Sequence, residues 1–463
     1  METDYLIVGA GAAGLAFADT LVDETDAAIT LVDRRTEVGG HWQDAYPFVR
    51  LHLSSALYGV NSTPLGDDQR QTSGRNAGFY EQATGAEVCA YFDRVLHERL
   101  EASGRVTFLG GHDHLGEDGA GAQAVRDLAT DRVIHIQPRR RVVDARYLEA
   151  SVPATHRPSF TVAGDVRCVP VNDLPRCVDD HDHVTILGGG KTSFDACLWL
   201  LDHGVEPDDI RWVRPREMWL TDRAGMQPLD DVGTLMDGLS RETEACAELD
   251  RPVDILERLE ELGRFLRIDE TRLPTRWVGT MVSRPEVDSL RTITDVVRLG
   301  HIASIEADLL SLTDGEVPSR RGSLYVDCSA AGLNQNPPRP VFTGDRITIQ
   351  NVRHNSPSFN AALIAWVEAR REEHDKNRLT APNRYVSDAD DAIGVHCRSW
   401  MTEATWRQDR ELSTWIDASR LNLTHGLRDH LAEPVARAGT QRYLETVGAA
   451  VARHQDAVHA LFG

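Results

Sequence analysis

The stretch that decides the fold is Tyr5-Leu6-Ile7-Val8-Gly9-Ala10-Gly11-Ala12-Ala13-Gly14, in which four apolar residues lead directly into a glycine-rich turn. The apolar run is too short for a helix and is typical of a buried parallel strand. Beyond the turn, apolar residues recur at helical spacing from Leu15 to Val22, and a β-branched run over 28–32 ends at Asp33. Strand, G-x-G-x-x-G turn, helix, strand and acid together predict a dinucleotide-binding unit.

Each glycine of such a turn has its own task. The first, Gly9, permits the tight bend, the second, Gly11, lets the backbone approach a pyrophosphate, and the third, Gly14, lets helix and strand pack closely. Asp33 is placed to accept hydrogen bonds from a ribose diol. We therefore expect the first cofactor to contact Gly9, Gly11, Ala13, Gly14, Asp33 and Arg34.

The same order of elements recurs in mid-chain. Residues 184–187 predict a strand, 188–193 the turn Gly-Gly-Gly-Lys-Thr-Ser, 194–201 a helix, and 210–213 a second strand. Two such units predict an α/β fold with two Rossmann-like domains, the second inserted into the first, and a helical C-terminal region.

The second turn is not a phosphate-binding NTPase loop, because that motif needs glycine where this chain has Thr185. No acid ends its second strand; Arg214 and Arg216 follow instead, and guanidinium groups suit a 2′-phosphate. The alternative is that both arginines are solvated surface charges. We expect FAD at the first turn and NADPH at the second, with these contacts to NADPH: Gly188, Gly190, Lys191, Thr192, Ser193, Arg214 and Arg216.

The rest of the chain divides around these two units. The expected domains are the first part of the FAD-binding domain (1–180), the NAD(P)-binding domain (181–320), a return segment of the FAD-binding domain (321–385) and the helical region (386–463). The strand and small-residue turn over 324–332 are interpreted as the chain returning to the first domain. Ser356 is expected to cap a helix that runs to about Ala369, with Pro357 at its first position.

Composition narrows the function further. The 463 residues carry 50 Lys and Arg against 72 Asp and Glu, a net charge of −22, which disfavours nucleic acids and anionic lipids as partners. Seven scattered cysteines without a C-x-x-C pair fit reduced thiols in the cytoplasm, and neither a membrane span nor a metal site is expected. A homodimer through the C-terminal helices is an option that the sequence leaves open.

Gly39-Gly40-His41-Trp42, just beyond the first unit, resembles the flavin-containing monooxygenase and Baeyer–Villiger class of enzymes. The resemblance extends to the order of the two fingerprints, and it implies that Gly40, His41 and Trp42 lie at the flavin edge. It also implies that Ala331, Gly332 and Ser356 of the return segment reach the cofactor. One departure is the F-x-G-x-x-x-H segment of those families, whose nearest match here, residues 162–168, lacks both signature side chains.

The resemblance implies an NADPH-driven, FAD-dependent monooxygenase that transfers one oxygen atom from O2 to a heteroatom or carbonyl of a small molecule. Asn61 is a candidate for a hydrogen bond at the flavin, or a loop-capping residue; Arg50 and His52 could meet an anionic substrate or the nicotinamide, or serve structure alone. Two alternatives stay open: a dehydrogenase or reductase without oxygen insertion, and a nucleotide-binding sensor without turnover.

Overall fold

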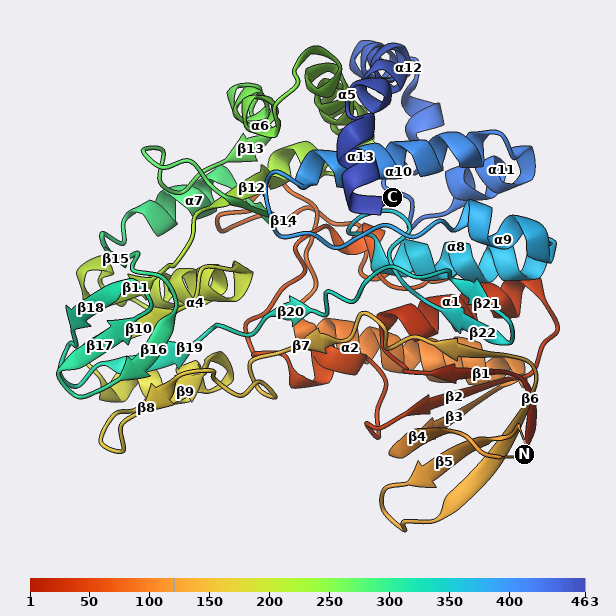
Figure 1. The fold of residues 1–463 in the computed structure, drawn as a ribbon, viewed down its shortest axis with the longest axis horizontal. Coiled ribbons are helices and arrows are strands. Elements are labelled where there is room, and N and C mark those ends of the chain that lie inside the picture. The colour runs from red at the N-terminus through yellow and green to blue at the C-terminus, as the bar shows by residue number, and fades with distance from the viewer. Residues whose placement is uncertain (120, 463) are drawn as a thin grey trace.

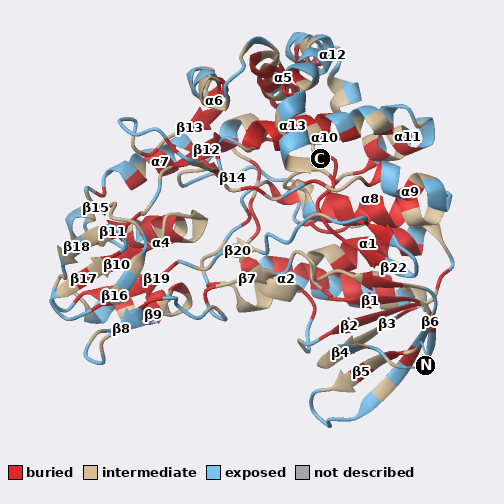
Figure 2. Ribbon diagram, in the orientation of Figure 1, coloured by how far each residue is buried: buried red, intermediate tan, exposed pale blue. Residues whose placement is uncertain are grey.

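Two sheets, each built around parallel strands, stand side by side under a layer of helices in the computed structural model, which describes residues 1–119 and 121–462 (Figure 1). The first sheet and the N-terminus lie at the lower right of the view, the second sheet at the left, and the C-terminal helices at the top. The central parallel strands and helix α8 are buried, whereas the outermost helices are partly exposed (Figure 2). The mixed α/β architecture expected from the sequence is confirmed.

The first sheet holds the first glycine turn at the carboxyl end of its central strand. Its strands run in the order β21-β22-β6-β1-β2-β3, with the hairpin β4–β5 continuing from β6. Helix α1 (Ala12–Glu24) follows the turn and packs against α8 (Pro357–Arg370). The strand bounds are β1 Glu2–Val8, β2 Ile29–Asp33, β3 Val106–Gly110, β4 His112–Glu117, β5 Gln123–Asp127, β6 Val133–Asp144, β21 Phe342–Thr343 and β22 Arg346–Thr348.

The second sheet repeats this arrangement with the order β15-β11-β10-β19-β9. Helix α4 (Lys191–Asp202) follows the second glycine turn. Its strands are β9 Cys168–Pro170, β10 Val184–Leu187, β11 Ile210–Val213, β15 Asp295–Val297 and β19 Leu324–Asp327, all paired in parallel. The chain leaves the first sheet after β6 and rejoins it at β22, so the second unit is inserted into the first, as expected.

One expectation about the return is wrong. The strand over 324–327 does not return to the first domain; as β19 it pairs with β10 at the centre of the second sheet. The return begins one step later, where β20 (Gly332–Leu333) pairs with β7 (Ala150–Ser151) between the two sheets, and it is completed by β22. The strand was assigned to the wrong sheet because a short apolar run carries no signal about its partners. The domain boundaries at 180, 320 and 385 stay a prediction.

Helix α8 begins at Pro357 as expected, but Ser356 does not cap it with its side chain. The Ser356 hydroxyl instead donates to the carbonyl oxygen of His354 at 3.2 Å. The helix is buried on nearly every side from Ser358 to Val367, which is typical of a helix inside a large core.

Helix α2 (Gly85–Arg94) is followed by a π-helical turn over Val95–Leu100. Strands β4 and β5 pair in antiparallel fashion, and Ala120 between them lies outside the described residues.

The top layer combines helices from the second domain with those of the C-terminus. Helix α12 packs closely on α5, and the backbone of β14 hydrogen-bonds to residues 387 and 389. None of the described helices is long and apolar enough to cross a membrane. The elements of this layer are β12 Met218–Asp222, α5 Val232–Glu248, α6 Pro252–Glu261, β13 Phe265–Leu266, β14 Arg276–Val282, α7 Arg284–Arg291, α9 Glu373–Leu379, α10 Ala392–Arg407, α11 Arg410–Ala418, α12 Pro434–Arg453 and α13 Gln455–Phe462.

Residues 66–82, which we call the arm, extend from the first domain onto the second. Arg75 in the arm contacts Asp202 of α4 at 2.7 Å and the Ser289 hydroxyl of α7 at 2.7 Å. Asn76 donates to Glu286, which also holds the fully buried Arg223 at 2.7 Å. The two domains are therefore joined by buried charge as well as by chain connections.

Candidate functional site

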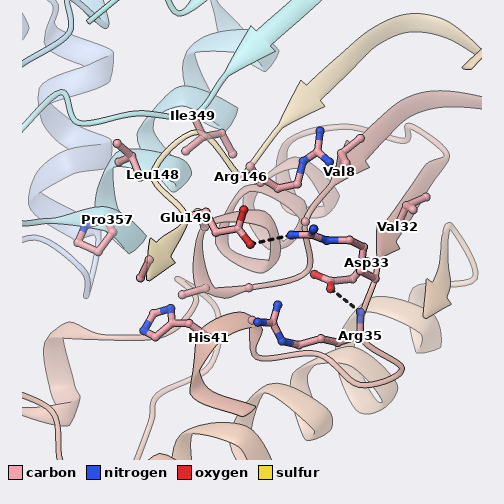
Figure 3. A pocket seen from close by; sticks show the side chains of 18 of the residues that line it. Val8, Val32, Asp33, Arg35, His41, Arg146, Leu148, Glu149, Ile349 and Pro357 are labelled. Atoms are coloured by element: carbon pink, nitrogen blue, oxygen red, sulfur yellow. Dashed lines mark hydrogen bonds and ion pairs between the residues drawn. The ribbon is translucent and has the colours of Figure 1, made fainter. Parts of the chain in front are cut away.

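A cavity opens at the carboxyl ends of β1, β2 and β6, where ligands bind in open α/β sheets (Figure 3). Its volume is about 1050 Å³, counting the part that is open to solvent. The residues that line it are Val8, Gly9, Gly11, Ala12, Ala13, Val32, Asp33, Arg34, Arg35, Gly40, His41, Tyr58, His112, His114, Ala145, Arg146, Leu148, Glu149, Ala150, Leu333, Ile349, Gln350 and Pro357.

The first glycine turn forms the floor of this cavity by close backbone packing. A Cβ on Gly14 would lie 1.9 Å from the carbonyl oxygen of Gly9, so only glycine lets α1 approach the strand here. Gly40 crosses behind the turn, and a Cβ on it would lie 2.9 Å from Cα of Gly11. A Cβ on Gly11 would have Cα of Gly40 as its nearest atom, at 3.5 Å, so the protein's own packing does not require glycine there, and the residue lines the cavity.

Asp33 is held at the end of β2 by the backbone. Its Oδ2 accepts from the Ala10 N–H at 2.7 Å and its Oδ1 from the Arg35 N–H at 2.9 Å, and the residue is 9% exposed (Figure 3). A carboxylate has about four acceptor sites, so two remain for a ribose diol. The residues present therefore fit an adenine dinucleotide at this turn.

Charged groups surround the cavity mouth. Arg34 pairs with Glu149 at 2.8 Å across the opening, and Arg35 pairs with Asp44. The Nε of Arg146 is buried without a hydrogen-bond partner. Burial lowers the pKa of His41 to about 4, with a smaller contribution from Arg35, so His41 is a neutral hydrogen-bonding group at physiological pH.

Seven of the residues predicted for the first cofactor line this cavity, namely Gly9, Gly11, Ala13, Asp33, Arg34, Gly40 and His41. Gly14 supports the turn from behind. Trp42 lies one layer away, donating from Nε1 to the Tyr58 hydroxyl at 2.8 Å, and Tyr58 lines the cavity. Ala331, Gly332 and Ser356 are not in the lining, but their neighbours Leu333 and Pro357 are.

One wall of the cavity was not predicted from the sequence. Its residues are Ala145, Arg146, Leu148, Glu149 and Ala150, which follow directly because β6 continues to Asp144. Pro138 and Arg139 to Arg141 interrupt the apolar pattern and hid this extension. Val142-Val143-Asp144, a β-branched pair ending in an acid, was the signal that could have revealed it.

The second glycine turn has the same construction. Gly188 has φ +138°, and a Cβ there would lie 2.7 Å from the Cys328 carbonyl oxygen, whereas a Cβ on Gly190 would meet no atom within 4 Å. Ser193, the small third position, donates to the Gly190 carbonyl at 2.7 Å. The open face of Gly190 at the N-terminus of α4 fits a second pyrophosphate.

The first domain touches this second turn directly. The Tyr46 hydroxyl donates to Asp195 at 2.7 Å, and Asp195 also pairs with Lys191 in the first turn of α4. Desolvation lowers the pKa of His52, and the charges of Lys191 and Arg223 lower it further. The structure thus brings His52 and Lys191, two predicted site residues, to the same boundary between domains.

The other two catalytic candidates lie elsewhere. Arg50 is exposed and donates to the Gln82 carbonyl at 2.9 Å. Asn61 accepts from the Ser419 hydroxyl at 2.8 Å, which ties its loop to the residues just after α11. Neither belongs to the lining of the cavity, and their catalytic roles stay predictions.

The arginines after β11 differ from each other. Arg214 is only 2% exposed, its guanidinium lies over the Trp212 ring at 4.6 Å, and its Nε and Nη1 are enclosed without partners. Arg216 is exposed and has His301 Nε2 at 3.3 Å from its Nη2. Of the two, Arg216 has the accessible guanidinium. Among the described residues, no group of His, Cys, Asp and Glu could hold a metal ion.

Comparison with known proteins agrees with this geometry. Residues 7–51 match the model of an NAD(P)-binding Rossmann-like domain. The uncharacterized protein Rv2000 of Mycobacterium tuberculosis is 40% identical over 468 residues, covering 99% of this chain and 86% of that protein, and the uncharacterized protein Mb2023 of Mycobacterium bovis matches equally well. The FAD-dependent monooxygenase resA of Aspergillus sclerotiorum is 27% identical over 45% of this chain and 36% of its own.

Solved structures show the fold over the whole chain. An oxidized steroid monooxygenase bound to NADP superposes with a TM-score of 0.50 at 15% identity, covering 100% of this chain and 98% of its own. A cyclohexanone-bound cyclohexanone monooxygenase gives 0.51 at 12% identity, covering 96% and 98%. The chain therefore has the fold of flavin-dependent oxidoreductases, and the helices after residue 386 are included in that likeness.

Proposed function

We propose, from the premise that this chain belongs to one family with the mycobacterial protein Rv2000, that it is an FAD-dependent, NADPH-driven monooxygenase. It would transfer one oxygen atom from O2 to a heteroatom or carbonyl group of a small molecule. The observation that carries the proposal is the pair of glycine turns, which are closed by backbone packing at Gly14 and Gly188 and have no close neighbour of a Cβ at their second glycines, Gly11 and Gly190.

The residues around the first turn would hold FAD. Asp33 would accept from the adenosine ribose, Gly11 and the N-terminus of α1 would face the pyrophosphate, and Arg34 with Glu149 would close the mouth. Bound there, the flavin would supply the redox chemistry that side chains alone lack. Pro357 brings the N-terminus of α8 to the cavity wall, where its partial positive charge favours a developing negative charge.

The second turn would hold NADPH with its pyrophosphate against Gly190. Tyr46, Asp195 and Lys191 fix the position of α4 relative to the first domain, so they would orient the nicotinamide toward the flavin. His52 stays neutral at the same boundary, since neighbouring cations and burial both oppose its protonation. It can therefore offer a hydrogen bond without adding charge.

One observation favours the reductase alternative, in which no oxygen is inserted. In place of the F-x-G-x-x-x-H segment, the chain has the exposed Val162 in β8 (Thr161–Val162) and Cys168 in β9. The side chains that accompany oxygen chemistry in the resembling enzymes are thus missing from this chain.

The test has two stages. Denatured protein should release FAD, and anaerobic NADPH should bleach the visible absorption of the bound flavin; failure of either result contradicts the proposal. Admitting ¹⁸O2 with a panel of ketones, sulfides and amines then separates the two enzymes. Label in an organic product supports the monooxygenase, whereas hydrogen peroxide alone supports the reductase.

A further inference from the structure

Two arginines that form no ion pair among the described residues, Arg216 and Arg276, have their backbones close together beside the second glycine turn. Arg216 follows β11, and a Cβ on Gly189 would lie 3.4 Å from its carbonyl oxygen, so this residue borders the turn itself. Arg276 opens β14, where its N–H donates to the Glu217 carbonyl at 3.3 Å, one residue beyond Arg216. Residues 60 positions apart in sequence thus meet beside the turn.

Neither guanidinium forms an ion pair with another described residue. The Arg216 side chain has His301 Nε2 at 3.3 Å, and the Nε of Arg276 is buried without a hydrogen-bond partner. In the described part of the chain, no carboxylate comes within ion-pair distance of either. The charge of Arg216 also lowers the pKa of Arg276, after the larger effect of burial, while Asp388 and Tyr385 oppose that shift.

The neighbouring arginines behave differently. Glu217 binds Arg214 at 3.0 Å and Arg298 at 2.8 Å, and Arg298 also reaches Asp269. In a protein with 72 acidic and 50 basic residues, two neighbouring arginines without an ion-pair partner repel each other unless an anion binds beside them. The phosphate of a coenzyme is the anion that a glycine turn brings to this place.

We propose that Arg216 and Arg276 form the two sides of a clamp for the 2′-phosphate of NADPH, and that Arg276 determines coenzyme specificity from outside the fingerprint. The inference rests on the assignment of NADPH to the second turn. Buried Arg214 is a positioning residue in this scheme, because its Cγ packs against Gly189 while its enclosed guanidinium cannot reach a phosphate. The clamp recognises a phosphomonoester on a ribose, which NADH lacks.

The experiment uses the full-length protein and the fragments 2′,5′-ADP and ADP, titrated by calorimetry. Wild type should bind 2′,5′-ADP more tightly than ADP. Arg276→Gln and Arg216→Gln should each weaken 2′,5′-ADP about tenfold or more, since a charged hydrogen bond contributes about 1.5 kcal/mol or more, and should leave ADP unchanged. Arg276→Lys should recover only part of the loss, because an ammonium lacks the planar fork.

Arg321→Gln is the matched control. Arg321 is an exposed arginine of the same domain, in the turn before β19 and hence at the opposite edge of the second sheet. Equal affinity of wild type for the two fragments, or equal losses for both in the variants, would overturn the clamp. If Arg276→Gln lowers the melting temperature, the result for Arg216→Gln decides the test, because Arg216 is exposed and its replacement should not disturb the fold.

The failure of the clamp can be told apart from the failure of the proposed function. Binding of 2′,5′-ADP requires no flavin, so a protein that lacked FAD could still discriminate between the fragments. Conversely, the protein could bind both fragments with equal affinity while NADPH and NADH bleach its flavin equally fast. That result would contradict the clamp but leave the proposed oxidoreductase function standing.

Discussion

At the scale of single residues, the two glycine turns contain glycines of two kinds. Gly14 and Gly188 are required by the protein, because a Cβ on either would strike a carbonyl oxygen. Gly190 is different: it has φ −105°, which any residue adopts, and open space where a Cβ would project. Its glycine is needed only if another molecule fills that space.

Gly190→Ala should therefore leave the fold intact and damage coenzyme binding alone. We expect a melting temperature within about 2 °C of wild type, since no strain or clash arises, and unchanged flavin content. The dissociation constant for NADPH, measured by fluorescence titration, should rise at least tenfold. Gly164→Ala, at another open glycine of the chain, is the control and should change neither quantity.

His354 supplies a second prediction at this scale. Its ring stacks on Trp277 at 4.8 Å and lies near His396, and burial lowers its pKa to about 3, with a smaller opposing effect of the Arg384 backbone. An unfolded histidine binds a proton near pH 6.5, so the unfolded state takes up protons first and stability falls as the pH drops from 6.5 toward 3. His354→Gln should lose less in melting temperature than wild type between pH 7 and pH 5. A parallel pH dependence would show that other groups carry the acid sensitivity.

The site residues that could be predicted from the sequence are those whose spacing is set by one local motif. Asp33 and the turn glycines could be found because their spacing is fixed by the strand–turn–helix geometry. Arg146 and Glu149 could not be, because Pro138 and the three arginines after it disguise the strand that presents them. Arg276 was missed for another reason, since only the pairing of β12 with β14 brings it beside Arg216.

At the scale of elements, the packing of α12 on α5 includes a direct backbone contact at a small residue. A Cβ on Gly439 would lie 2.8 Å from both the N and the Cα of Asp237, so the two backbones are in direct contact. Strand β19, by contrast, could not be assigned to its sheet from its own residues. Its four residues are buried in the second sheet, yet nothing within them distinguishes that sheet from the first, and the sequence interpretation failed there.

Gly439→Ala should push α12 away from α5 and destabilise the protein by about 1 to 3 kcal/mol, as overpacking does. Urea unfolding followed by circular dichroism measures this loss. Gly448→Ala lies on the same helix with no atom within 4 Å of its Cβ, and should be neutral or slightly stabilising because alanine favours helix. Equal effects of the two changes would mean that the helices do not touch at Gly439.

At the scale of the whole molecule, the arm contacts a buried ionic centre of the second domain through Asn76. Arg223 is 1% exposed and contacts Glu286, Asn76 and the carbonyl oxygens of His52 and Met281. Glu286 is nearly as well enclosed, and Arg223 helps to hold its pKa below the usual range against the effect of burial. This centre lies beside His52, at the boundary where the two coenzymes would meet.

Glu286→Gln should cost about 3 to 5 kcal/mol, because it leaves the Arg223 charge buried without its partner. The loss should appear in urea unfolding and as faster tryptic cleavage of the arm. Asp202→Asn is the control, since its exposed pair with Arg75 should contribute at most about 1 kcal/mol. Similar losses of unfolding free energy in both variants would contradict a special contribution of the buried Arg223–Glu286 pair.

The hydrogen bonds between β14 and the chain just before α10 have a practical consequence. The Trp277 N–H donates to the Ser387 carbonyl, and the Ala389 N–H donates to the Thr275 carbonyl. Residues 387–389 are therefore hydrogen-bonded along the start of β14. A truncated chain ending near residue 380 would retain both glycine turns but leave this edge of β14 without its backbone hydrogen bonds. We therefore expect such a truncation to weaken discrimination between NADPH and NADH before it lowers the flavin content.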